Sequence, residues 1–327
     1  MGYKLIEGFE GGDASDWTLA NGAAVISSAG LDMDGNYSLS LNSVGYTEYA
    51  TKVIDALSEG YISLRWRVSG FFFLNGGIGV MSDGQNLISI GVLNGIFKAY
   101  RNTTLIASGT VDITINTTYL LEMYVKIDDT VGEVKLWING ILDIDFTGNT
   151  KPGAETTFNK IIAGKIGSDL SYSKLYIDNV IVSDSYIGEK FIQTIIPTGT
   201  GNSDEFTPSA GDNWECVDDI PGSEDDYCET NTPDAVCTFE MSNLTGDIGA
   251  VHGVSVSALA KIEGETAVPK LQLVIRSDGN DYVSDSKDVP FVTATAINEI
   301  WSEDPAGGSL TETIVNGFEI GFKAKAS

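Results

Sequence analysis

Residues 134–146 read Val-Lys-Leu-Trp-Ile-Asn-Gly-Ile-Leu-Asp-Ile-Asp-Phe, two short runs joined by Asn139-Gly140. Apolar and polar side chains alternate in both runs, as they do in strands with one buried face. Asn-Gly between two such runs favours a type I′ turn, because both central residues of that turn take a positive φ. The stretch is therefore predicted to be an antiparallel β-hairpin.

The same alternation recurs on both sides of this hairpin. Residues 61–68 and 120–127 each place apolar side chains at every second position, and Asn94-Gly95 separates the runs 88–93 and 96–100. About a dozen strand-like runs follow one another at short spacing, and the only helical pattern is a short turn at 311–315. This series predicts an all-β protein built as an antiparallel sandwich.

The chain has 327 residues, which suits two domains better than one. Its 19 Lys and Arg against 46 Asp and Glu leave a net charge of −27. A field of this sign repels nucleic-acid phosphates and anionic lipids, so neither is an expected partner. No run approaches the ~20 apolar residues of a membrane span, and the first residues lack the apolar stretch of a secretory signal. No membrane insertion is expected, and the protein is expected to fold in the cell that makes it.

The acidity is uneven along the chain. Residues 1–186 hold 12 basic and 21 acidic residues, whereas residues 187–327 hold 7 and 25. A Gly- and Pro-containing acidic stretch also begins near Pro197 and extends to about residue 235. These changes predict two domains, 1–186 and 187–327. The acidic residues of 204–229 are interpreted as solvated surface, with divalent ions or a basic partner as the alternative.

Several stretches of the first domain follow one another in an order that can be compared with known folds. Phe9-Glu10-Gly11 and Trp17 come first, residues 88–100 and 134–140 contain strand and Asn-Gly units, and residues 175–182 read Leu-Tyr-Ile-Asp-Asn-Val-Ile-Val. Over residues 5–184 this order resembles concanavalin-like and laminin-G-like jelly rolls and several carbohydrate-binding modules. The resemblance implies a jelly-roll β-sandwich. It also implies structural calcium, the only cofactor expected, held by Glu10 of the first strand and Asp178 of the last.

The second domain shows a different resemblance. Trp214, residues 217–221 and Tyr227 are followed by residues 248–256, 274–282, 304–311 and Asn316-Gly317-Phe318. This order resembles a domain of virion structural proteins in tailed bacteriophages. Alternation within residues 254–262 predicts strands here too, and hence a second, smaller β-sandwich.

The residue sets that catalysis needs are missing from the sequence. His252 is the only histidine, so a histidine-based triad or metal centre has a single contributor. The Glu-x-Asp-x-x-Glu run of glucanases that share the jelly roll does not occur, nor do a nucleophile elbow, a P-loop or a dinucleotide fingerprint. The chain is therefore predicted not to be an enzyme.

The two resemblances together predict a non-catalytic accessory structural protein of a tailed-phage virion. It would be a capsid decoration or head fibre on the virion surface, made in the host cytoplasm. Its partners would be major capsid or tail subunits and copies of itself, in a homo-oligomer such as a trimer. The alternative is a carbohydrate-binding adhesin, on tail or head, that attaches the particle to host glycans. A secreted glycanase or lectin is the third hypothesis.

Aromatic and charged residues share the polar phase of three of the predicted strands: Tyr61, Arg65, Arg67, Glu122, Tyr124, Lys126, Lys135 and Trp137. If these strands are neighbours, the residues form one face, and flat rings beside polar groups are what sugar binding requires. The candidate glycan-binding residues are Tyr61, Arg65, Glu122, Tyr124 and Trp137. A solvated sheet face or a subunit contact is the favoured alternative for this pattern, since aromatic residues also mark protein interfaces.

The cysteines offer two further possibilities. Cys216, Cys228 and Cys237 could hold zinc together with His252, but the closely spaced cysteine pair typical of zinc sites is missing. A Cys216–Cys228 disulfide could form after release from the reducing cytosol. Free thiols are the default expectation.

Overall fold

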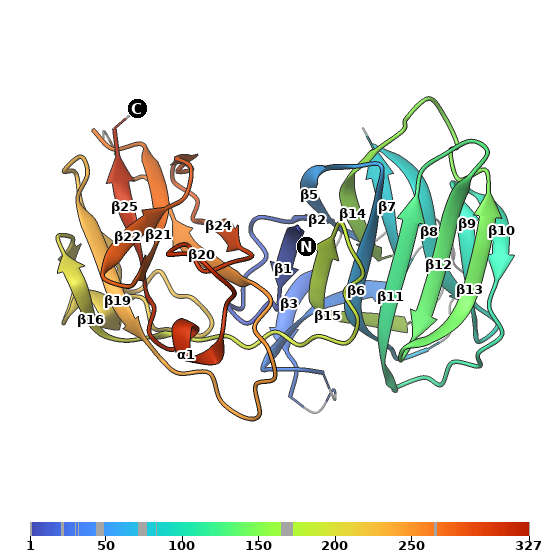
Figure 1. Cartoon of the computed structure of the whole chain (residues 1–327), viewed down its shortest axis with the longest axis horizontal. Coiled ribbons are helices and arrows are strands. Elements are labelled where there is room, and N and C mark those ends of the chain that lie inside the picture. Colours follow the sequence, from blue (N-terminus) through green and yellow to red (C-terminus); the bar gives the residue numbers. More distant parts are fainter. Residues whose placement is uncertain are drawn as a thin grey trace. The chain divides into compact units, whose positions relative to one another are not determined.

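The computed structural model describes residues 2–20, 23–29, 31, 33–43, 49–70, 77–82, 84–164, 173–264 and 267–326. These residues are almost entirely β-strand and connecting loop, which confirms the all-β prediction (Figure 1). They form two compact units. Unit 1 consists of Met1–Phe9 and Trp17–Ile192, and unit 2 of Glu10–Asp16 and Gln193–Ser327.

Unit 1 is a jelly-roll-like sandwich of two antiparallel sheets. The larger sheet has the strand order β13-β12-β11-β6-β15-β4-β3, with β1 paired to β15, and the smaller sheet has the order β10-β9-β8-β7-β14-β5-β2. The strands of the larger sheet are β1 (Tyr3–Glu7), β3 (Ala24–Ser27), β4 (Tyr37–Ser43), β6 (Glu59–Val68), β11 (Thr118–Lys126), β12 (Gly132–Ile138), β13 (Ile141–Gly148) and β15 (Ser173–Ser183). Those of the smaller sheet are β2 (Thr18–Ala20), β5 (Tyr49–Leu57), β7 (Ile78–Ser82), β8 (Gln85–Leu93), β9 (Ile96–Arg101), β10 (Thr104–Ser108) and β14 (Phe158–Gly164).

The hairpin turns and the core of unit 1 follow the sequence pattern. Asn139 and Gly140 both have positive φ, 48° and 78°, as the predicted type I′ turn requires. Leu64 and Trp66, on the apolar phase of β6, are buried, and the Trp66 ring lies 5.1 Å from the Phe97 ring of the smaller sheet. The apolar phase of the larger sheet therefore faces the other sheet. The polar phase of β6, β11 and β12 is left on the outside.

Unit 2 is a second, smaller sandwich. Its main sheet has the order β16-β19-β25-β21-β22, with β23 on β21, and β20 pairs with β24. The elements are β16 (Pro197–Asp204), β17 (Thr207–Pro208), the 3-10 helix η1 (Asn213–Cys216), β18 (Cys228–Glu229), β19 (Val236–Met241), β20 (Val254–Ala260), β21 (Lys270–Ser277), β22 (Asn280–Val283), β23 (Lys287–Asp288), β24 (Thr295–Trp301), α1 (Glu312–Val315) and β25 (Glu319–Lys325). Its core joins Leu273 and Ile275 of the main sheet to Val256 and Ile297 of the β20–β24 pair. The predicted turn at 311–315 is α1, with the Thr311 hydroxyl accepting from the Ile314 N–H at 3.2 Å.

The division between the units differs from the predicted 186/187 boundary in two places. Residues 187–192 belong to unit 1, and the early segment 10–16 belongs to unit 2. In unit 2 the Gly222 N–H donates to the Gly11 carbonyl at 2.8 Å, and the Ala296 N–H donates to the Ser15 hydroxyl at 2.8 Å. These contacts join segments that are distant in sequence, so strand periodicity carries no sign of them.

None of the described helices is long and apolar enough to cross a membrane.

Candidate functional site

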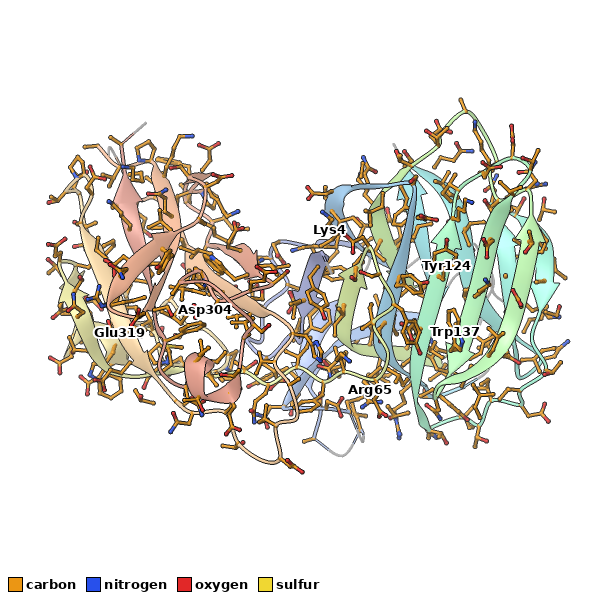
Figure 2. The ribbon with its side chains drawn as sticks, viewed as in Figure 1. Lys4, Arg65, Tyr124, Trp137, Asp304 and Glu319 are labelled. Carbon is orange, nitrogen blue, oxygen red and sulfur yellow. The ribbon has the colours of Figure 1, made fainter. Side chains whose placement is uncertain are left out.

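The predicted glycan-binding residues lie together on the outer face of the larger sheet. β6, β11 and β12 are neighbours in that sheet. The cross-strand sets are Tyr61–Tyr124–Lys135, Ser63–Glu122–Trp137 and Arg65–Leu120. Residues directly opposite each other on paired strands point to the same face, so the alternation and the register together gather these side chains. Tyr124, Trp137 and Arg65 can be followed on this sheet in Figure 2.

Four rings on this face contact one another and form what we call the aromatic cluster: Tyr61, Tyr124, Trp137 and Tyr186. The Tyr61 ring centre lies 4.8 Å from that of Tyr124 and 6.5 Å from that of Trp137. Tyr186 meets both Tyr61 and Trp137 edge to face, at 5.8 and 5.9 Å. These distances suit favourable aromatic pairs, so the rings hold one another in place. Tyr186 remains 50% exposed and is the most open of the four.

Tyr186 comes from the segment that follows β15, residues 184–192, which we call the connecting segment. It crosses the outer face of the sheet and is held there by Glu122. One Glu122 carboxylate oxygen accepts the N–H of Ile187 at 2.9 Å and that of Gly188 at 3.1 Å. Ile187 is buried in this position. The sequence interpretation places residues 187–192 in the second domain and therefore does not include Glu189 in this site. It does not include Tyr186 either, because Tyr186 follows the last predicted strand of the first domain. The one available signal was an aromatic–aliphatic pair, Tyr186-Ile187, directly after the last strand.

Glu122 is therefore a buried carboxyl and not an exposed one. Burial raises its pKa above the ordinary value, although the two N–H donors and a hydrogen bond with Tyr186 act in the opposite direction. The negative charge of Glu122, and then burial, in turn raise the pKa of the Tyr186 hydroxyl.

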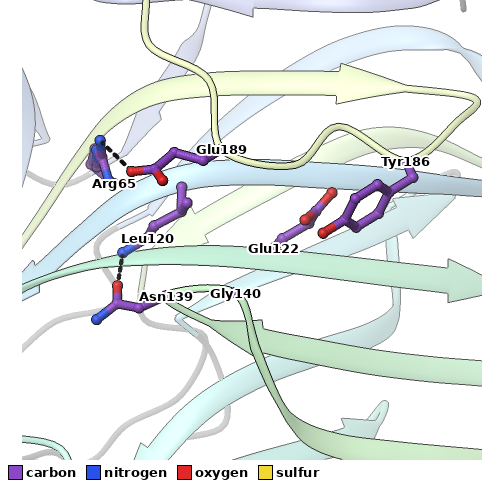
Figure 3. A pocket seen from close by; sticks show the side chains of 7 residues that line it. All are labelled: Arg65, Leu120, Glu122, Asn139, Gly140, Tyr186 and Glu189. Atoms are coloured by element: carbon purple, nitrogen blue, oxygen red, sulfur yellow. Dashed lines mark hydrogen bonds and ion pairs between the residues drawn. The ribbon is translucent and has the colours of Figure 1, made fainter.

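A hollow of about 160 Å³ opens between the connecting segment and the β12–β13 turn (Figure 3). It is lined by Arg65, Leu120, Glu122, Asn139, Gly140, Tyr186 and Glu189. The Asn139 side-chain oxygen accepts the Leu120 N–H at 2.8 Å, which fixes the amide at the rim. The hollow is smaller than the ~300–1,000 Å³ of sites that enclose drug-sized ligands. It can therefore hold one small polar unit and leave the rest of a larger ligand on the aromatic cluster.

Two basic groups of this face, Arg65 and Lys135, lie beside acids. Arg65 Nε donates to Asp34 Oδ2 at 2.8 Å, and Arg65 Nη2 lies 3.9 Å from Glu189 Oε1. Lys135 Nζ lies 2.6 Å from Glu133 Oε2 and 5.8 Å from the centre of the Tyr124 ring. Both cations are thus neutralised locally, and they orient their neighbours.

Tyr124 is held at its other end by an acid. Its hydroxyl donates to Glu59 Oε2 at 2.7 Å. Burial, and then this hydrogen bond, raise the pKa of Tyr124 well above its ordinary value. Tyr124 therefore stays protonated and acts as a fixed ring.

The predicted calcium ligands do not come together within one unit. Asp178 is fully buried in β15 of unit 1, where one of its oxygens accepts the Asn179 N–H at 2.7 Å. Glu10 is buried too, but it belongs to unit 2. Over the described residues, no group of three or more His, Cys, Asp or Glu is arranged to hold a metal. Calcium binding by Glu10 and Asp178 stays a prediction, which a change of melting temperature in EDTA would test.

The cysteines of unit 2 are free thiols, and the Cys216–Cys228 disulfide, the alternative to free thiols, is not formed in the structure. Cys216 donates to the Ala210 carbonyl at 3.0 Å, which gives its thiol a different partner. Burial raises the pKa of Cys228 to about 12 and also raises that of Cys237. Formation of the disulfide on oxidation stays a prediction, and no described metal group joins the three cysteines to His252.

Comparisons with known proteins give structural likeness alone. No family model matches the sequence, and no curated protein matches it. Among solved structures, the chain is similar to the cellulose induced protein Cip1, with 13% identity and a TM-score of 0.46 over 57% of this chain and 100% of that one. It is similar to the alginate lyase Aly36B, with 15% identity and a TM-score of 0.37 over 54% of this chain and 100% of that one. The carbohydrate esterase of Shiga toxin-encoding bacteriophage phi24B aligns with 16% identity and a TM-score of 0.40, over 55% of this chain and 98% of that one.

The prediction that the chain is not an enzyme is corrected by these structures. They include an alginate lyase, a glucuronan lyase and a carbohydrate esterase. The prediction relies on the absence of one glucanase motif and of a few nucleophile and cofactor motifs, and that absence does not exclude chemistry that uses other residues. Identities and scores this low transfer no activity to the present chain, but catalysis is not excluded by its fold.

Proposed function

We propose that unit 1 binds carbohydrate on the outer face of its larger sheet, with one sugar unit in the hollow and its neighbours on the aromatic cluster. The observation that carries the proposal is the hollow itself, where the half-exposed Tyr186 ring stands beside the polar groups of Arg65, Glu122 and Asn139. A sugar has apolar C–H faces that pack on aromatic rings and hydroxyls that need hydrogen-bond partners. A ring next to fixed polar groups meets both requirements.

The test is retention on immobilised glycans, with substitutions on and off the face. Trp137→Ala and Tyr186→Ala each remove one ring, and each should weaken retention about 2- to 10-fold, because an aromatic contact is worth ~0.5–1.5 kcal/mol. Tyr227→Ala is the matched control, since Tyr227 is 51% exposed and lies in unit 2. Full retention by both unit 1 variants would overturn the proposal. The same incubations, assayed for new reducing ends, determine whether the bound glycan is also cleaved.

The setting that we propose is the surface of a tailed-phage particle, where the chain would act as an adhesin in contact with capsid or tail subunits and with copies of itself. What supports this is the order of residues in the second unit, from Trp214 to Phe318. Antibody labelling of intact particles would test it, because the chain should be found on the head or the tail. Its absence from every particle would overturn the virion setting and leave the carbohydrate proposal intact.

A further inference from the structure

We propose that the hollow accepts an uncharged sugar unit and discriminates against sugars that carry a carboxylate. The inference rests on the proposed carbohydrate function and names the ligand class of the same site. It follows from the charges that line the hollow and from the partners that its basic groups already have.

The lining holds one cation and two carboxyl groups. The cation is Arg65, and the carboxyl groups belong to Glu122 and Glu189. A ligand carboxylate in this space would lie beside two acids and would need a free cation to compensate. Like charges a few ångströms apart in a partly desolvated site repel each other strongly.

Arg65 already has acids beside two of its nitrogens. Its Nε donates to Asp34, and its Nη2 faces the Glu189 carboxylate (Figure 3). Asp34 is itself fixed by a second donor, Asn179 Nδ2, at 2.6 Å. On the neighbouring strand β15, the residue paired with Arg65 is another acid, the buried Asp178. Arg65 therefore sits among acids whose charges already offset its own, so a bound anion would gain little net attraction from it.

The other basic residues near the hollow do not change this balance. Lys135 is paired with Glu133, and Lys190 Nζ lies 3.5 Å from the Glu189 carbonyl without lining the hollow. Arg67 follows on the same phase of β6, and its Nε is buried without a hydrogen-bond partner among the described residues, but Arg67 does not line the hollow. The net charge of −27 adds a long-range repulsion of polyanions.

The hydrogen-bonding groups of the hollow suit hydroxyls. The Glu189 side chain is 78% exposed and offers carboxylate oxygens that accept from hydroxyl donors. The Asn139 amide oxygen is occupied by the Leu120 N–H, which leaves its Nδ2 as a donor at the rim. A neutral sugar supplies donors and acceptors in the same ring. A carboxylate supplies acceptors only, opposite a lining rich in acceptors.

The experiment uses the full chain and pairs of oligosaccharides that differ only in one group, such as glucose against glucuronate and galactose against galacturonate units. Retention of the neutral member should exceed that of the acidic member at least 10-fold. The preference should persist at about 1 M salt, where the Debye length is ~3 Å and the long-range field of the chain is screened. Glu189→Gln removes one acid and frees Arg65 Nη2, so it should narrow the ratio about threefold or more.

The outcomes separate this inference from the function on which it rests. Equal or stronger retention of the acidic member, lost in Tyr186→Ala, would overturn the inference and leave carbohydrate binding in place. A preference for the neutral sugar that disappears at high salt, or that Glu189→Gln leaves unchanged, would also overturn the inference. In either case the charges that line the hollow would not be the source of the preference. Retention of neither member of any pair would overturn the proposed function itself.

Discussion

The attachment of the connecting segment to Glu122 makes a quantitative prediction. Glu122→Ala removes the acceptor of two N–H groups, those of Ile187 and Gly188, and Ile187 is 2% exposed. A buried donor left without a partner costs ~1–3 kcal/mol. The connecting segment can detach from the sheet, and its amides are then hydrated. We therefore expect the free energy of opening of this segment to fall by about 2–4 kcal/mol in total. That range corresponds to a ~30- to 1,000-fold change in the opening equilibrium.

Hydrogen exchange of a peptide covering residues 184–192 measures this opening directly. Exchange there should accelerate by about that factor in Glu122→Ala, while peptides from β8 and β9 keep their protection. Glu122→Gln keeps an acceptor oxygen and should lose less. Glu133→Ala is the matched control, because it removes a partly exposed acid of the same face whose ion pair is worth only ~0–1 kcal/mol. Unchanged exchange in Glu122→Ala would refute the reasoning.

The same carboxyl gives a pH dependence of defined sign. Burial raises the pKa of Glu122 in the folded state above its ordinary value of 4.5. Between the two pKa values the folded state binds more protons than the unfolded state, so the free energy of unfolding falls as pH rises through that window. The contribution is fully present below pH 4.5 and is lost as pH passes the folded pKa. Glu122→Gln cannot titrate and should lack this part of the slope, which urea titrations at several pH values would detect. Equal slopes would contradict the raised pKa.

Three further predictions concern unit 2. Val292 is 61% exposed and has a φ of 71°, a backbone conformation that strains a β-branched residue by ~1–3 kcal/mol. The Val292→Gly variant should therefore melt at the same or a higher temperature than the wild type, whereas the control Val283→Gly, in β22, should melt at a lower one. A lower melting temperature for Val292→Gly would contradict the strain. A fragment of residues 193–327 lacks the hydrogen bonds that Gly222, Ala296 and Asn298 make to residues 10–16. Its free energy of unfolding should be ~2–4 kcal/mol lower than that of the same region in the full chain. Equal midpoints in urea titrations of the fragment and the full chain would count against this. All three thiols should react with a disulfide reagent in denaturant. In the native protein at pH 8 the reaction should be slow, because burial raises the pKa of Cys228 to about 12. A single reactive thiol in denaturant would indicate a Cys216–Cys228 disulfide.

Local pattern was sufficient for the fold class and for part of the site. Alternation with period two predicts which side chains share a face, and Asn-Gly at 139–140 predicts which strands pair as a hairpin. Tyr124 and Trp137 could therefore be assigned to one outer face from residue order alone, once their strands were assumed to be neighbours. The structure has those strands adjacent, with Glu122 opposite Trp137.

The burial of Glu122 could not be predicted in this way. On its own strand it has the polar phase of an exposed residue, and only the path of the connecting segment covers it. The same applies to Tyr186 and Glu189, which follow the last strand of unit 1 in a stretch without periodicity. Their position depends on where the chain turns after β15, and that turn is set by contacts with residues about 65 positions earlier.

Residue order by itself thus determined that this protein is all-β, that its first part is a sandwich, and which phase of each strand faces outward. Strand periodicity is a local property, so local residues are enough to show it. Tertiary structure alone decided that residues 10–16 join unit 2, that Glu10 and Asp178 belong to different units, and that a segment outside the strands completes the hollow. These features arise from contacts between residues far apart in the chain, so they cannot be predicted from the spacing of neighbouring residues.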